Sequence, residues 1–153
     1  MNDEGFMKLA IEEALKSQAS SGTPIGAVLV KDNKVIATGQ SLVWPHKDPT
    51  AHGEAQCLRN ACQKFQTLDL SGCTLYSTLE SCSMCLGCAG WCKLSKIVFG
   101  AYIEDVEPNP YELDNYHAIQ HAKRIVGLEV VGGVLQAECK ELMKNIQNWT
   151  PVE

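Results

Sequence analysis

Two short motifs, separated by about thirty residues, carry the side chains best suited to chemistry. The first contains His52 and, two residues later, Glu54, and the second contains Cys82 and Cys85. An imidazole and two thiols are good zinc ligands, and zinc with three protein ligands keeps its fourth position for water, whereas a structural site closes with four. The pattern therefore predicts a catalytic zinc site with His52, Cys82 and Cys85 as ligands.

Glu54 is predicted to move protons and not to bind the metal. The segment from about residue 50 to 63 has a helical pattern, for which Asp48 and Pro49 offer an N-cap and a first helical residue. Residues two apart do not share a helix face, so His52 can take the metal while Glu54 flanks it. A carboxylate in that position suits general acid and base catalysis.

The cysteines also allow two other interpretations. Four of them have the spacing of a bacterial ferredoxin iron-sulfur site: Cys82, Cys85, Cys88 and Cys92. Ferredoxin motifs end in Cys-Pro, whereas Lys93 follows here, and no second cluster of cysteines is present. We therefore expect Cys88 and Cys92 to be packing residues. The second alternative, a closed structural zinc site, has no use for the carboxylate of Glu54.

Alternating helices and strands must position these residues. Apolar periodicity predicts helices at 3–19, 50–63, from 81 or 82 onward, 111–125 and 137–146. Strands are predicted at 25–30, 34–39, 73–77, 96–101 and 128–131, the first two joined by a hairpin turn. This order predicts an α/β fold in which the later strands pair mostly in parallel.

The length and the charge of the chain limit the number of domains and the kinds of partner that it can have. The 153 residues fit one domain, 1–153. Lys and Arg number 13 against 18 Asp and Glu, a net charge of -5 with no basic run, which argues against a nucleic-acid partner. The acidic N-terminus does not resemble a secretory signal, and no apolar run approaches the roughly 20 residues of a membrane span. We expect a cytoplasmic protein without a membrane partner, whose eight cysteines serve as metal ligands and buried thiols.

The order His-x-Glu followed by Cys-x-x-Cys is typical of zinc-dependent base and nucleoside deaminases. The chain resembles the cytidine-deaminase-like superfamily, in particular the branch of guanine deaminases, fungal-type cytosine deaminases and tRNA adenosine deaminases. Further similarity lies at residues 24–27, 48–54, 78–80 and 98–101. The resemblance implies a three-layer α-β-α sandwich around a mixed sheet of about five strands, one catalytic Zn²⁺ per chain, hydrolytic deamination through Glu54, and a homodimer.

The resemblance also suggests substrate-binding residues. Trp91 lies six residues after Cys85, where guanine deaminases have a tryptophan beside the base. Asp114 lies fifteen residues after Phe99, the spacing of the aspartate with which those enzymes bind the purine. Ser41 stands where the family commonly has an asparagine that bonds the carbonyl of the base. We therefore expect a free aminated base as the substrate, with guanine favoured.

Other features agree with different substrates. His-Gly-Glu and Trp149 are shared with fungal cytosine deaminase, although Val152 replaces the aspartate of that tail. Residues 78–80 and 98–101 are similar to the corresponding segments of tRNA adenosine deaminases. The negative net charge argues against a tRNA substrate. Ser81 replaces the proline that usually precedes the first cysteine, and serine can begin the same helix as an N-cap. A non-catalytic zinc-binding module is the alternative from another class.

Overall fold

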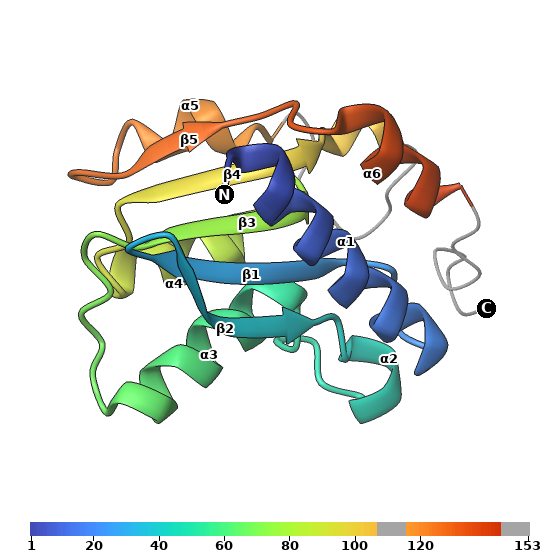
Figure 1. Ribbon diagram of the computed structural model, residues 1–153, viewed down its shortest axis with the longest axis horizontal. Helices are drawn as coiled ribbons and strands as arrows, with labels where there is room; N and C mark the ends of the chain where they lie inside the picture. Colours follow the sequence, from blue (N-terminus) through green and yellow to red (C-terminus); the bar gives the residue numbers. More distant parts are fainter. Residues whose placement is uncertain (107–115, 145–153) are drawn as a thin grey trace.

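The computed structural model describes residues 1–106 and 116–144. Its centre is a mixed five-stranded sheet of order β2-β1-β3-β4-β5 (Figure 1). The strands are β1 (Gly26–Lys31), β2 (Lys34–Gln40), β3 (Thr74–Leu79), β4 (Lys96–Ala101) and β5 (Glu129–Val131). The helices are α1 (Asp3–Ala19), α2 (Val43–His46), α3 (Gly53–Phe65), α4 (Ser83–Trp91), α5 (Ala118–Ala122) and α6 (Gln136–Met143), with a 3-10 turn η1 (Ile103–Val106). Among the described residues, no helix has both the length and the apolar character needed to cross a bilayer.

The sheet contains both antiparallel and parallel pairs of strands. β1 is antiparallel to β2 and β3, whereas β3, β4 and β5 are parallel. The hairpin between β1 and β2 turns at Asp32 and Asn33, both with positive φ, which matches the right-handed twist of the strands. The predicted α/β fold with parallel later strands is confirmed.

Alternate residues of each strand enter two separate cores, because successive side chains point to opposite faces. Leu29, Leu75 and Ile97 pack with the side chains of α3, α4 and α5. Val28 and Val98 face the other way, toward α1 and α6. Helices therefore cover both faces of the sheet, as Figure 1 shows, and the three-layer arrangement is confirmed.

Two glycines let helices lie directly against the sheet. A Cβ on Gly39 of β2 would lie 2.2 Å from the carbonyl oxygen of Gly53 and 2.4 Å from the backbone nitrogen of Cys57. A Cβ on Gly26 of β1 would lie 2.2 Å from the backbone nitrogen of Ala14. The close approach at Gly39 fixes the first turns of α3, where His52 and Glu54 are found.

The start of α3 differs from the prediction. The helix begins at Gly53 with His52 as its N-cap, and not near residue 50. The Asp48 carboxylate accepts hydrogen bonds from the backbone N–H and the hydroxyl of Thr50, at 2.8 and 2.7 Å. Asp48 therefore closes a local turn two residues ahead instead of capping a helix, a competing use that aspartate side chains often find.

Other boundaries also differ. Residues 43–46 form the short helix α2 within a segment predicted as a loop. Of the helix predicted at 111–125, residues 111–115 lie outside the described residues, and of the rest only Ala118–Ala122 is helical. The last helix is described as Gln136–Met143.

Candidate active site

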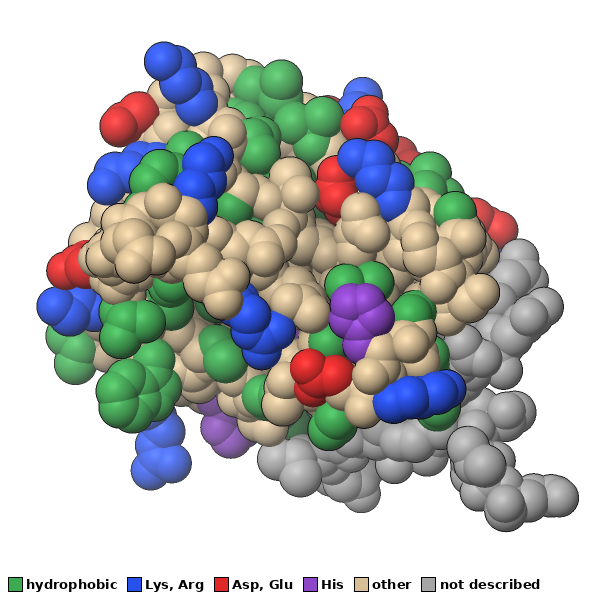
Figure 2. Space-filling view, turned by 90° about the horizontal axis from the view of Figure 1, so that it is seen from below, with side chains coloured by type: hydrophobic (Ala, Val, Ile, Leu, Met, Phe, Trp, Pro, Cys, Tyr) green, Lys and Arg blue, Asp and Glu red, His purple; other side chains and the backbone are tan. Residues whose placement is uncertain are grey.

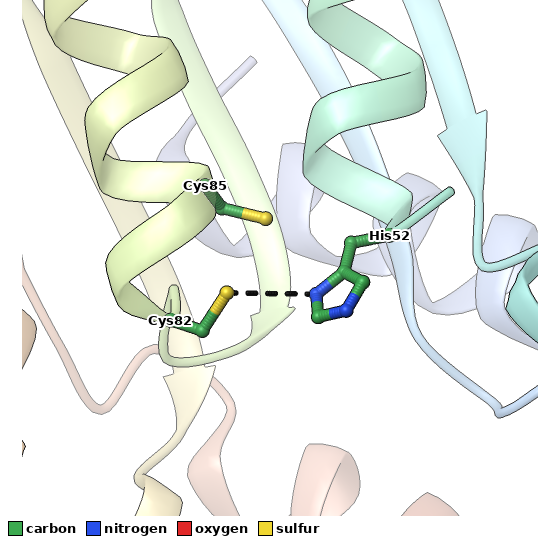
Figure 3. Close-up of side chains that lie close together, drawn as sticks. All are labelled: His52, Cys82 and Cys85. Atoms are coloured by element: carbon green, nitrogen blue, oxygen red, sulfur yellow. Dashed lines mark hydrogen bonds between the residues drawn. The ribbon is translucent and has the colours of Figure 1, made fainter. Parts of the chain in front are cut away.

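One group of metal-binding side chains is found among the described residues, and it is the predicted one. The ligand atoms of His52, Cys82 and Cys85 all lie within 4.8 Å of one another. Figure 3 shows the two thiols and the imidazole pointing toward one another from α3 and α4. The Cys82 Sγ and His52 Nδ1 are 3.5 Å apart, close to the roughly 3.5 Å that tetrahedral zinc with ordinary Zn–S and Zn–N bonds would impose. The donor set fits one zinc ion with a fourth position left open.

The fold places these ligands at the beginnings of two helices. His52 is the N-cap of α3 and Cys82 is the N-cap of α4, both in extended backbone conformations. Cys85 lies in the first turn of α4 and is buried. The partial positive charge at a helix N-terminus favours thiolate over thiol, and thiolate is the form that binds metal.

The two thiols affect the pKa values of each other in opposite directions. A hydrogen bond from Cys85 lowers the pKa of Cys82, and His52 lowers it further against the opposing effect of burial. The same hydrogen bond, together with burial, raises the pKa of Cys85. The lowered pKa favours the thiolate form of Cys82, which is the form that binds metal.

Glu54 lies beside the ligands with its carboxyl group enclosed. Only 3% of the residue is exposed. Burial is the main cause that raises the pKa of Glu54, and the Cys82 thiolate raises it further, while His52 and the nearby Ser81 hydroxyl act in the opposite direction. A buried carboxyl that readily holds a proton is suited to accept and return protons next to the metal position.

Of the predicted substrate-binding residues, the structure describes Ser41, which is buried, and Trp91, which is exposed. Ser41 is buried, and the next residue, Leu42, donates its backbone N–H to the Ala51 carbonyl at 2.8 Å, so this segment lies against the one that leads to His52. Trp91 ends α4 about 9 Å along the helix axis from Cys85, given a rise of about 1.5 Å per residue. The residue is 81% exposed. Asp114 and Trp149 lie outside the described residues.

The cysteines do not assemble as an iron-sulfur site. Cys92 is 3.7 Å from Cys62 of α3, sulfur to sulfur. Cys88 packs with the core between the sheet and α3, α4 and α5. Only Cys82 and Cys85 of the four join the metal-binding group found among the described residues. Cys88 and Cys92 are packing residues, as expected.

Glu80 is a buried carboxylate whose structural role the sequence did not predict. Its two oxygens accept hydrogen bonds from the backbone N–H groups of Ile103, at 3.1 Å, and Ala118, at 2.7 Å. It thereby links the start of η1 and the start of α5 to the segment that leads into Cys82. The available signal was an acidic residue directly after an apolar strand, since a carboxylate there needs donors if it is buried.

Known proteins share this fold and these motifs. Residues 1–101 match the family model of the cytidine and deoxycytidylate deaminase zinc-binding region. A tRNA-specific adenosine deaminase of Haemophilus influenzae is 39% identical over 140 residues, covering 91% of this chain and 79% of the relative. A guanine deaminase of Bacillus subtilis is 41% identical over 102 residues, 66% of this chain and 65% of the relative. The structure of a guanine deaminase from Nitrosomonas europaea has a TM-score of 0.83 at 25% identity and covers 94% of this chain and 83% of that chain.

The family match contains both motifs from which the site is built, with His52 and Glu54 in one and Cys82 and Cys85 in the other. The relatives are named as deaminases, in agreement with this family match. The chain belongs to the cytidine and deoxycytidylate deaminase zinc-binding family and is a zinc-dependent deaminase.

Proposed function

We propose that this deaminase acts on an adenosine within tRNA, converting it to inosine with release of ammonia. The supporting observation is the extent of the similarity beyond the zinc motifs. The match to the Haemophilus influenzae tRNA adenosine deaminase covers 91% of this chain, whereas the match to the Bacillus subtilis guanine deaminase covers 66%. This order reverses the expectation from the sequence, in which free guanine came first and a nucleic-acid partner was disfavoured.

His52, Cys82 and Cys85 would hold the zinc, which supplies a water activated for attack at neutral pH. Glu54 would accept a proton from the attacking water and return protons to the ring nitrogen and to the leaving amine. The carbon that bore the amine then carries an oxygen, and ammonia leaves. Burial of Glu54 keeps bulk water from competing for these protons.

Charge on the described surface bears on how a polynucleotide would bind. On the face covered by α3, Lys and Arg side chains are separated from one another and mixed with Asp and Glu (Figure 2). The whole chain has a net charge of -5. We therefore expect tRNA binding through a few individual cations, with a shallow dependence of affinity on salt, because that slope follows the number of phosphates neutralised.

Guanine is the second candidate substrate. Trp91 at six residues after Cys85 favours it, as does the similarity to the Nitrosomonas europaea guanine deaminase over 94% of this chain. The exposure of Trp91 is compatible with a role in a pocket only if another segment or subunit covers it. Asp114 would accept hydrogen bonds from the purine N–H groups, a charge-assisted contact.

A direct comparison of the two substrates tests the proposal. The zinc-loaded protein is incubated with tRNA that contains unmodified adenosine, and with free guanine, and inosine and ammonia are measured. We expect inosine in the tRNA and little ammonia from guanine. Ammonia from guanine with unchanged tRNA would support the second candidate, and Asp114→Ala should then lower kcat/KM for guanine by roughly 10² or more. Product from neither substrate, with zinc bound, would contradict both.

We also propose a homodimer, as the resemblance to the superfamily implies. The 81% exposure of Trp91 agrees with a surface that a second subunit covers, because large aromatic side chains are enriched at interfaces. Light scattering on the protein as it elutes from a size-exclusion column should give a mass of about twice the 16.7 kDa of one chain. A mass of one chain at micromolar concentration would refute the dimer.

A further inference from the structure

Two cysteines outside the metal-binding group face each other across α3 and α4. The Sγ atoms of Cys62 and Cys92 are 3.7 Å apart, and both thiols are free. We propose that Cys62 and Cys92 form a peroxide-sensitive thiol pair, which closes into a disulfide between the C-terminal ends of the two helices.

The geometry requires only a small movement. A disulfide has an S–S bond of about 2.05 Å, so the sulfur atoms must approach by roughly 1.6 Å. Cys62 lies three residues before the end of α3, and Cys92 is the C-cap of α4. Helix ends adjust their backbone at lower cost than helix interiors, because their last carbonyl groups have no partner within the helix.

The two thiols differ in access, which sets the order of the steps. Cys62 is partly exposed, whereas Cys92 is buried. Cys62 reacts first with hydrogen peroxide, giving a sulfenic acid and one water. The Cys92 thiol then attacks the Cys62 sulfur, the S–S bond forms, the S–O bond breaks, and the oxygen leaves as a second water with the thiol proton. Two thiols are oxidised by two electrons and one peroxide is reduced.

The surroundings of Cys92 affect the rate of the second step. Burial is the main cause that raises the pKa of Cys92 to about 12, and the neighbouring Cys62 thiol raises it further. Because the thiolate is the attacking species, closure should be slow at neutral pH and accelerate as the pH rises. Cys88, one turn earlier on α4 and partly exposed, is the competing partner for Cys62.

The bond would join the same two helices that begin at the metal-binding residues. His52 and Cys82 are the N-caps of α3 and α4, while Cys62 and Cys92 lie near the opposite ends. The disulfide closes a loop of 30 residues in the unfolded chain. Loop closure of this size should raise Tm by about 5 °C or more, provided that the native geometry is not strained.

Peptide mapping of the zinc-loaded full chain tests the proposal. After hydrogen peroxide, thiol blocking and trypsin under non-reducing conditions, residues 60–64, which contain Cys62, should be linked to residues 65–93. Fragment ions should place the bond on Cys92, and dithiothreitol should reverse both the link and the rise in Tm. Metal content, measured in parallel, should not change.

Matched serine variants separate the alternatives. Cys62→Ser and Cys92→Ser should each abolish the link, and Cys88→Ser should leave it unchanged. If either variant fails to fold, the fragment ions from the parent protein still decide. A Cys62–Cys88 bond, a sulfinic acid on Cys62 without any link, or an unmodified Cys62 would each overturn the proposal. These readouts do not depend on which substrate the deaminase uses.

Discussion

At the scale of single residues, the site combines a carboxyl group that holds its proton with a thiol, Cys82, that releases its proton. Burial and the Cys82 thiolate raise the pKa of Glu54. A hydrogen bond from Cys85 lowers the pKa of Cys82. The site therefore favours a protonated Glu54 next to a deprotonated Cys82. This arrangement is typical of a site that binds a cation and moves protons beside it.

Replacing Glu54 with glutamine should separate catalysis from metal binding. The amide has nearly the same shape but cannot shuttle protons, so turnover should fall by about 10² to 10⁴, the usual contribution of a positioned acid or base. Zinc content, measured by elemental analysis, should stay near one per chain. Zinc lost from Glu54→Gln but retained by Cys88→Ser would mean that Glu54 is a ligand.

Asp105 gives a prediction for stability against pH. Burial alone would raise the pKa of this carboxyl, but hydrogen bonds from Gln136, Lys140 and the backbone N–H of Tyr102 outweigh burial and lower the pKa. A carboxyl with a lowered folded pKa stabilises the protein above the unfolded pKa, and this contribution is lost as pH falls. Asp105→Asn should cost about 1 to 2 kcal/mol at pH 7.

The difference between Asp105→Asn and the parent should shrink as pH falls from about 5 toward 3, through the unfolded pKa of about 3.9. Urea unfolding at several pH values measures it. Glu104→Gln, an exposed change on the same turn, is the control and should alter stability little at any pH. A gap between Asp105→Asn and the parent that stays constant down to pH 3 would contradict the assigned role.

At the scale of helices and strands, the fold was more predictable than the boundaries near the site. The strands show as apolar runs, and the turn at Asp32 and Asn33 is a local signal, so both were found. The start of α3 was predicted wrongly because Asp48 can cap either a helix or a turn. The structure selects the turn, in which Asp48 bonds Thr50. Sequence alone does not distinguish two local uses of one carboxylate.

The contact of α3 with β2 at Gly39 predicts a sharp difference between two glycines. An alanine Cβ at Gly39 would lie 2.2 Å from the Gly53 carbonyl, so Gly39→Ala must push the start of α3 away from the sheet. We expect a loss of about 1 to 3 kcal/mol in the free energy of unfolding. Activity should fall as well, since His52 and Glu54 move with that turn.

Gly87→Ala is the matched control. Gly87 lies within α4, and a Cβ there has no neighbour within 4 Å. Alanine in a helix interior is favoured over glycine, so this variant should gain about 0.5 to 1 kcal/mol. Thermal unfolding of both variants measures the contrast. Equal stability of Gly39→Ala and the parent would show that α3 can shift without cost.

At the scale of the whole molecule, the ligand set was predictable and the substrate contacts were not. The spacings of His52 with Glu54 and of Cys82 with Cys85 are local, and the structure brings three of these four side chains together as the predicted metal-binding group. Ser41 and Trp91 were assigned by resemblance, and their positions relative to the metal-binding group depend on packing between distant segments. Glu80 was missed for the same reason, because its partners Ile103 and Ala118 are far away in sequence.

Removing the metal should loosen the beginnings of α3 and α4 and leave the sheet intact. The strands pack through their own cores on both faces and do not depend on the ligands. After chelation of the metal, amide hydrogen exchange in the first turns of these helices should accelerate about tenfold or more. This acceleration corresponds to a loss of about 1.4 kcal/mol in local stability. Exchange in β1, β3 and β4 should not change. Equal acceleration throughout would indicate global unfolding.

Because His52 and Cys82 are the caps of helices that the sheet already supports, a molecule without zinc would persist as a folded but inactive form. Total protein and active protein would then be separate quantities, linked by the supply of metal. Adding zinc back would restore activity on the timescale of ligand capture, without a refolding step. Specific activities of different preparations would be comparable only when they are divided by bound zinc.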